Sequence, residues 1–268
     1  MAQRQLRSFR SLRDGQFRAV DYINLLALAV GIISGLFIIT GTPIALILLP
    51  ILAGLGLDGI LRSHPAGRLR DAAAEALDLV TPVAFVFAAA LFFRWAASGY
   101  WSLLAAIATA VLFGIVAYAA YYGQNAASTE NGATRLAILG ADYITLLAFL
   151  SVFYAHDYSY LAASLLAGVA ATLVAIDIFR DAGLSFPEHA LFALAAGVFV
   201  ALSRWAIAYV RIDGILAAVL LLVAFYVGVG VTVAALTRRL DQRAGAEFVS
   251  VSVVGLLVVV IGRVVGGS

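Results

Sequence analysis

Long apolar runs recur along the whole chain and constrain its fold more than any other feature. Each run holds about 20 residues, the length that a helix needs to cross a hydrocarbon core of ~30 Å. Apolar residues make up 64% of the 268-residue chain and charged residues only 12%, whereas about a quarter of the residues in a soluble domain are charged. We therefore expect an all-α, polytopic membrane bundle of about nine transmembrane helices. The expected spans cover residues 22–40, 43–61, 76–97, 102–122, 136–155, 159–179, 189–209, 213–236 and 248–265.

Two residue types are missing from the chain, and their absence excludes several kinds of site. There is no cysteine, which excludes disulfides, thiolate zinc sites and cysteine nucleophiles. All 17 basic residues are arginine, so a Schiff base to retinal or pyridoxal phosphate and a P-loop lysine are excluded as well. The net charge is +2, but the arginines lie between the apolar runs, where they act as orientation signals. We expect no nucleic-acid partner.

The arginines also predict the orientation of the chain in the membrane. With nine spans, 13 of them lie on the same side as the N-terminus and only four on the other side. Because cytoplasmic segments are enriched in arginine, we expect a cytoplasmic N-terminus and an external C-terminus in the plasma membrane. Residues 1–21 are polar and arginine-rich, and the first apolar run lacks a small-residue cleavage site. This predicts a retained first helix. The four arginines on the outer side are Arg94, Arg204, Arg211 and Arg263.

An internal duplication is the most informative pattern in the chain. Residues 21–27 return as residues 142–148, identical at six of seven positions. Two other landmarks return in the same order, Asp58 as Asp177 and Arg94-Trp95 as Arg204-Trp205. A repeat of four spans keeps its orientation, so we expect two parallel four-helix repeats followed by one extra helix. The expected parts are a cytoplasmic N-terminus (1–21), repeat one (22–122), a cytoplasmic linker (123–135), repeat two (136–239) and the C-terminal helix (248–265).

Most polar residues near the spans have an ordinary structural explanation. Four acids lie at expected helix starts, where a carboxylate caps free N–H groups and suits the helix dipole. The three histidines are expected at the surface. Two arginines lie beside tryptophan near outer helix ends, which is typical of an interfacial anchor, with a pocket for lipid headgroups as the alternative. These residues are Asp21, Asp78, Asp142 and Glu188; His64, His156 and His189; and Arg94 and Arg204.

Asp58 and Asp177 differ from the other acids because they lie near helix C-termini, where the dipole disfavours a negative charge. Arg62 follows Asp58 by four residues and Arg180 follows Asp177 by three, so each pair shares a helix face. We expect two local ion pairs at the cytoplasmic interface. The alternative is a cytoplasm-facing carboxylate site, because ionisable groups near a membrane are costly unless they are used.

The segment after the second span carries the one suggestion of chemistry. Asp58 is followed by Asp71, Glu75 and Asp78, and the last three fall on one face if a helix begins near residue 68. Three carboxylates on one face repel unless a cation or the nearby arginines compensate. We favour Arg68 and Arg70 as the compensating groups. A Mg²⁺ ion held by carboxylate oxygens is the alternative.

The Asp58-Gly59-Ile60-Leu61-Arg62 segment, with Gly67-x-x-x-Asp71-x-x-x-Glu75 after it, resembles the signature of the CDP-alcohol phosphatidyltransferase family. The resemblance covers about 25 residues and implies a Mg²⁺-dependent enzyme of lipid headgroup synthesis at the cytoplasmic face. It also implies that Asp58, Asp71 and Glu75 are the metal ligands. Leu55 stands where the signature has its first aspartate.

Taken without that resemblance, the sequence predicts a membrane protein without a recognisable catalytic site. Such a protein is transporter-like or an accessory membrane subunit, needs no cofactor, and has membrane lipids, a second copy or another membrane protein as partners. The phosphatidyltransferase-like enzyme, with Mg²⁺, is the alternative. The candidate polar site consists of Asp58, Arg62, Asp71, Glu75, Asp78, Asp177, Arg180 and Glu188.

Overall fold

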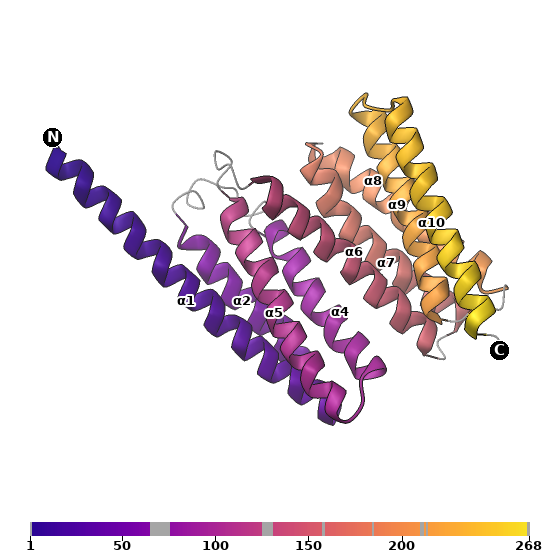
Figure 1. The fold of residues 1–268 in the computed structure, drawn as a ribbon, viewed down its shortest axis with the longest axis horizontal. Coiled ribbons are helices and arrows are strands. Elements are labelled where there is room, and N and C mark those ends of the chain that lie inside the picture. Colours follow the sequence, from indigo (N-terminus) through magenta and orange to yellow (C-terminus); the bar gives the residue numbers. More distant parts are fainter. Residues whose placement is uncertain are drawn as a thin grey trace. The chain divides into compact units, whose positions relative to one another are not determined.

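A computed structural model describes residues 2–64, 76–124, 131–156, 159–183, 185–209, 212 and 214–266 (Figure 1). Side chains are described from residue 19 onward, apart from those at 131, 186 and 266. In this part of the chain there are nine helices and no strand. The helices are α1 (Ala2–Thr40), α2 (Pro43–Arg62), α4 (Val80–Ala96), α5 (Tyr100–Gly123), α6 (Asn131–Ala155), α7 (Tyr160–Asp181), α8 (Phe186–Ile207), α9 (Gly214–Leu236) and α10 (Gln242–Gly266).

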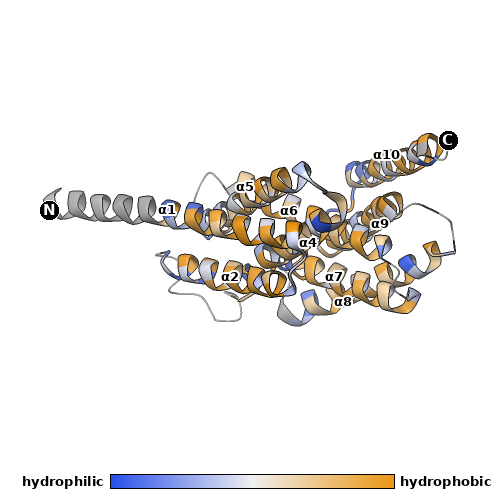
Figure 2. Ribbon diagram, turned by 90° about the horizontal axis from the view of Figure 1, so that it is seen from below, coloured by the Kyte–Doolittle hydropathy of each residue, from blue (hydrophilic) through white to orange (hydrophobic). Residues whose placement is uncertain are grey.

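The described helices confirm the expected membrane bundle. All nine are long and apolar enough to cross a membrane, and the candidate spans begin and end within a few residues of the predicted ones, or six for the last. Hydrophobic residues run along the helices and hydrophilic ones gather towards helix ends (Figure 2). The apolar length of each run therefore predicted its helix correctly.

Several helices begin earlier than the sequence predicted, and in two of them an acid was assigned to the helix start. α1 starts at Ala2 and α6 at Asn131, so Asp21 and Asp142 lie well inside their helices. The prediction that these acids cap helix starts is wrong. The polar residues before each apolar run continue the helix outward, and a change in polarity does not by itself end a helix.

The helix ends follow local sequence signals. α1 stops at Gly41, which adopts a φ of 70° and donates its N–H to Phe37 O at 2.8 Å. This left-handed position is one that glycine tolerates. α2 then begins with Pro43, whose fixed φ suits the first helical position. α7 begins after Ser159, whose hydroxyl accepts the N–H of Ala162.

The chain forms two compact units, Met1–Ala141 and Asp142–Ser268, and the boundary falls within α6. In unit 1, α1 packs on α2, α4 and α5, and α4 packs on both α2 and α5. α1 and α5 approach closely through small residues, because a Cβ at Gly31 would lie only 2.6 Å from Ala110 Cβ.

Unit 2 is built from α7, α8, α9, α10 and the second half of α6. α7 packs on α8, and α9 packs on α7, α8 and α10. The Tyr143 ring of α6 lies 6.1 Å from the Phe225 ring of α9. α7 and α8 are in backbone contact, since a Cβ at Gly168 would lie 2.9 Å from Gly197 O. α10 contacts α9 with one face and has a largely exposed apolar surface.

The buried faces of two helix pairs match at a constant spacing. The buried stripe of α2 is followed 118 residues later by that of α7, and the buried stripe of α5 is followed 112 residues later by that of α9. The α2 and α7 stripes are Ala45, Leu49, Ala53, Leu57 and Leu61 against Ala163, Ala167, Ala171, Ala175 and Phe179. The α5 and α9 stripes are Ala105, Ala106, Thr109, Phe113 and Ala117 against Ala217, Ala218, Leu221, Phe225 and Val229.

Candidate functional site

Polar side chains gather at both ends of each unit, the ion-pair end and the arginine end. The ion-pair end is where α2 finishes and α4 begins in unit 1, and where α7 finishes and α8 begins in unit 2. It holds the Asp58–Arg62 and Asp177–Arg180 pairs. The arginine end is where α4 or α8 finishes and α5 or α9 begins, and it holds Arg94 and Arg204.

Both predicted ion pairs are confirmed. Arg62 Nε donates to Asp58 Oδ1 at 3.0 Å, four residues apart on α2. Arg180 Nη2 donates to Asp177 Oδ1, three residues apart on α7. Each guanidinium lies in the last turn of its helix, where a cation favours the dipole and offsets the unfavourable acid.

The two aspartates lie in different environments. The Asp58 side chain is 26% exposed, whereas that of Asp177 is only 8% exposed. Arg180 follows Arg62 by the same 118 residues that separate the buried stripes, but Asp177 follows Asp58 by 119. One residue turns a side chain by about 100° around the helix axis. Measured from the buried stripe of its own helix, each carboxylate therefore lies at a different angle.

The other predicted site residues at this end are only partly described. Glu188 has a helix-start role, because its Oε2 accepts the Ser185 N–H at 3.1 Å and the Ser185 hydroxyl at 2.6 Å. Asp78 lies just before α4 but is itself in helical backbone, and the N-cap position of α4 is Leu79, so Asp78 does not cap this helix as predicted. Asp71 and Glu75 lie outside the described residues, as do Arg68 and Arg70.

The proposed Mg²⁺ ligand set therefore stays a prediction. Of Asp58, Asp71 and Glu75, only Asp58 is described, and its Oδ1 is bonded to Arg62. Within the described ranges, no three acidic or histidine side chains lie close enough together to hold a metal ion.

Two of the three histidines are buried, which corrects the expectation that they lie at the surface. His64 follows the end of α2 and meets the buried ring of Tyr121 edge-on, with ring centroids 4.8 Å apart. His189 is buried in the first turn of α8. Only His156 is exposed, with Nδ1 3.1 Å from Val152 O. Burial depends on which helix face meets a neighbour, and the sequence does not show that.

At the arginine end of unit 1, Arg94 closes the end of α1. Its Nη1 donates to Ile38 O at 3.0 Å and to Ile39 O at 3.5 Å. These carbonyls belong to the last turn of α1, where no further helical turn supplies N–H groups that would donate to them. The guanidinium also lies against Gly41, where a Cβ would be 2.9 Å from Nη2. Arg94 therefore caps a helix, in addition to any anchoring role.

At the arginine end of unit 2, Arg204 is buried, with only 5% of its surface exposed. Its guanidinium carbon lies 4.0 Å from the centroid of the Tyr154 ring of α6. Its Nε and Nη1 find no hydrogen-bond partner among the described residues. The predicted interfacial anchor is wrong for this arginine, because an anchor keeps its charged head in water. The neighbouring Trp205 does lie outward, 49% exposed.

Among the described residues, the buried acids and the buried arginine all belong to unit 2. Asp142, Asp177, His189 and Arg204 are buried, together with the hydroxyl residues Thr145, Ser151 and Ser164. The sequence placed the chemistry in the first half of the chain, because it shows the density of charges but not their burial. The one available signal was the spacing Ser164-x-x-x-Gly168, which places a hydroxyl on the small-residue face of α7.

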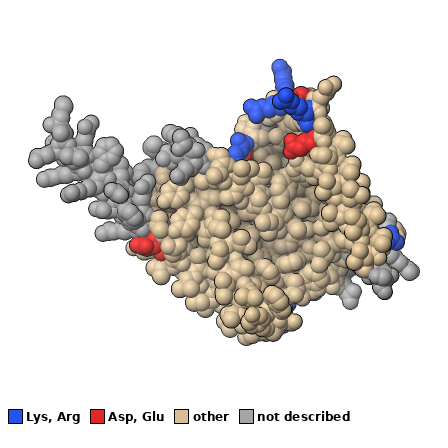
Figure 3. All heavy atoms as spheres, viewed as in Figure 1, with Lys and Arg blue, Asp and Glu red and all other residues tan. Residues whose placement is uncertain are grey.

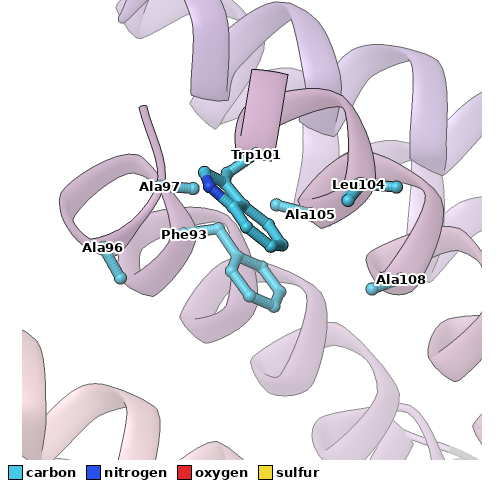
Figure 4. Close-up of a pocket in the computed structure, with 7 residues that line it drawn as sticks. All are labelled: Phe93, Ala96, Ala97, Trp101, Leu104, Ala105 and Ala108. Carbon is cyan, nitrogen blue, oxygen red and sulfur yellow. The ribbon is translucent and has the colours of Figure 1, made fainter. Parts of the chain in front are cut away.

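A pocket of about 310 Å³ opens at the arginine end of unit 1, between α4 and α5 (Figure 4). The rings of Phe93 and Trp101 lie side by side in it, and alanines line much of the rest. Its lining is apolar and offers no catalytic group. Charged side chains are also sparse on the face drawn in Figure 3, where they form a few small groups beside a broad uncharged surface.

The fold and the apolar spans define a multi-pass helical membrane protein. Residues 24–262 match the DUF5656 family, described as proteins of unknown function, and the chain belongs to this family. No curated protein and no solved structure matches the chain.

Proposed function

We propose that this protein is a transporter-like membrane bundle whose polar path lies in unit 2. The observation that carries this proposal is the burial of Asp142, Asp177, His189 and Arg204 within helices that are apolar enough to span a membrane. Burying ionisable groups in a membrane is costly, and such residues are typical of substrate and ion pathways. Three of these four groups are carboxyl or imidazole side chains, which are the usual members of proton relays.

The buried polar groups are distributed along the length of unit 2. Asp177 and His189 lie at the ion-pair end, and Arg204 lies at the arginine end. Between them, α6 carries Asp142 and, nine residues further along, Ser151. At 1.5 Å per residue these two lie about 14 Å apart along the helix axis. A succession of this kind suits the stepwise movement of a proton or a small polar solute.

The proposal includes two parallel repeats, with α1, α2, α4 and α5 equivalent to α6, α7, α8 and α9. The constant spacing of the buried stripes supports it. So does the packing, since the second and third helices of each unit contact each other, and the third contacts the fourth. In both units the arginine that ends the third helix reaches the first, as Arg94 does with Ile38 and Arg204 with Tyr154. With the arginine count of the loops, this favours a cytoplasmic ion-pair end.

Proton movement in proteoliposomes tests the transport proposal, with an entrapped pH-sensitive dye as the readout. We expect vesicles with the wild-type protein to dissipate an imposed pH gradient faster than protein-free vesicles. Asp142→Asn should lose most of this additional rate. Asp21→Asn is the matched control, because Asp21 is the exposed counterpart in the duplicated sequence and should leave the rate unchanged.

A wild-type rate equal to that of protein-free vesicles, measured with correctly folded protein, would contradict the proposal. It would favour the accessory-subunit interpretation, in which the buried groups bind a partner subunit or stabilise the bundle. A retained rate in Asp142→Asn would place the path elsewhere.

The phosphatidyltransferase-like alternative has one observation in its favour. The Asp58 carboxylate is a quarter exposed at the ion-pair end, and the segment that carries Asp71 and Glu75 follows it in the sequence. A titration with Mg²⁺ or Mn²⁺ followed by thermal unfolding tests it, since a bound metal raises the melting temperature. A rise that Asp71→Ala abolishes would favour the enzyme. An equal rise in melting temperature in the wild type and in Asp71→Ala, or no rise in either, would count against the enzyme alternative.

A further inference from the structure

At the arginine end of unit 2, three buried hydrogen-bond donors have no acceptor among the described residues. Arg204 Nε and Nη1 have no partner in the described residues, and neither has the hydroxyl of Tyr154. The guanidinium stacks on the ring of Tyr154, 4.0 Å from its centroid, so these donors belong to one contact. A buried unpaired cation is among the costliest arrangements in a protein, and it requires a compensating negative group.

Ser164 adds a fourth unsatisfied polar atom at the same level. Its Oγ is buried and has no partner among the described residues. α7 and α8 are antiparallel at this point, because Gly168 meets Gly197 and Ala201 while Thr172 meets Gly197. Ser164 lies one helical turn from Gly168 towards the start of α7.

Arg204 occupies the matching position on α8. It lies three residues after Ala201, on the same face and one turn nearer the end of the helix. The start of α7 and the end of α8 are adjacent in an antiparallel pair, so Ser164 and Arg204 emerge at one level of their interface. α9 also begins here, since a Cβ at Gly214 would lie 3.3 Å from Tyr154 Cβ. The positive end of the α9 dipole favours an anion.

We propose that Arg204, Tyr154 and Ser164 bind a phosphate group between α6, α7 and α8. A phosphate group offers three or four acceptor oxygens in a tetrahedral arrangement, whereas a carboxylate offers only two in one plane. Its oxygens accept from one edge of the Arg204 guanidinium and from the hydroxyls of Tyr154 and Ser164. The group is the headgroup phosphate of a phospholipid or a free phosphate compound.

The depth of the site suits either source. Arg204 lies three residues before the end of the span Pro187–Ile207, which is about one helical turn from the membrane surface. Trp205 lies in the same helical turn and is exposed on the surface of the unit. An exposed tryptophan near the end of a span is typical of the headgroup level of a membrane.

The corresponding arginine of unit 1 bonds to the backbone of its own unit. Arg94 already donates to the carbonyls of Ile38 and Ile39, and it is exposed. The two arginines share a place in the duplicated sequence but differ in whether their donors are used. Arg94 is therefore the natural control for Arg204.

Thermal unfolding of the delipidated protein in detergent, followed by tryptophan fluorescence, tests the site in two arms. One arm adds inorganic phosphate at low millimolar concentration, below the range in which phosphate salts stabilise proteins generally, with chloride at equal ionic strength as reference. The other adds phosphatidylglycerol, with the diacylglycerol of the same chains as the phosphate-free reference. We expect the wild-type melting temperature to rise above its reference in at least one arm.

The variants connect this rise to the site. Arg204→Gln should abolish it, whereas Arg94→Gln should keep it even if its starting melting temperature is lower. Tyr154→Phe removes one hydroxyl without changing the ring, and should raise the half-saturating ligand concentration about tenfold. Tyr154→Phe and Ser164→Ala carry the test if Arg204→Gln does not fold.

Each outcome decides the proposal. A rise with phosphatidylglycerol alone supports a lipid headgroup as the ligand, and a rise with inorganic phosphate supports a free phosphate compound. No rise in either arm overturns the proposal. So does a rise of equal size and midpoint in the wild type and in Arg204→Gln, or in the wild type and in Tyr154→Phe.

Discussion

At the scale of single residues, the same acid–arginine pair is placed in two environments. The spacing of three or four residues was enough to predict both pairs, because it is a local property of a helix. The difference in burial between Asp58 and Asp177 was not predictable, since it follows from the neighbours that each helix meets. The same limit explains why His64, His189 and Arg204 were expected at the surface and are buried.

We expect Asp177→Asn to destabilise the protein more than Asp58→Asn. Removing the Asp177 charge leaves Arg180 beside a poorly hydrated site, which costs about 1–3 kcal/mol when partial exposure of the arginine is allowed for. The Asp58–Arg62 pair is more exposed, and losing it should cost less than about 1 kcal/mol. Unfolding curves in a mild detergent give both values. Equal losses would show that the burial of Asp177 has no energetic consequence.

At the scale of helices, the sequence predicted which segments form helices better than it predicted where those helices begin. Each apolar run formed the expected helix, because only a helix satisfies its own backbone in a membrane. The early starts of α1 and α6 were missed, and the roles assigned to Asp21 and Asp142 failed with them. Helix pairing was not predicted, because the sequence does not show which helix faces meet.

The contact between α7 and α8 predicts a strong effect of a single methyl group. A Cβ at Gly197 would collide with Gly168 O and Thr172, so the helices must separate. We expect Gly197→Ala to lower the unfolding free energy by about 1–3 kcal/mol, as overpacking does elsewhere. Gly59→Ala is the matched control, because nothing lies within 4 Å of that position in α2. A Gly197→Ala protein as stable as this control would mean that α7 and α8 are not in backbone contact.

At the scale of the whole molecule, the chain comprises two compact units, and its duplicated landmarks predict that they are parallel repeats. The number of arginines on each side orients such a chain in a membrane, and from it we expect the ion-pair end to face the cytoplasm. Packing within each unit follows from small residues on facing helices.

Single cysteines test orientation and span number together, because the natural chain has none to interfere. Ser98 lies between α4 and α5, and Ser159 lies between α6 and α7. If every helix crosses the membrane, the two intervening helices return the chain to the same side. Both Ser98→Cys and Ser159→Cys should therefore react with a membrane-impermeant maleimide on intact cells. Leu240→Cys, between α9 and α10 and 56% exposed, should react only after the cells are permeabilised.

The pattern of labelling separates the ways in which this prediction can fail. Labelling of Leu240→Cys alone on intact cells would reverse the orientation and keep nine spans, which would leave the arginine distribution without its expected effect. Labelling of Ser98→Cys without Ser159→Cys would mean that α5 and α6 do not both cross, and the two units could not then be parallel. Labelling of Ser98→Cys and Ser159→Cys alone would fit the predicted count, because an odd number of crossings separates each of them from Leu240.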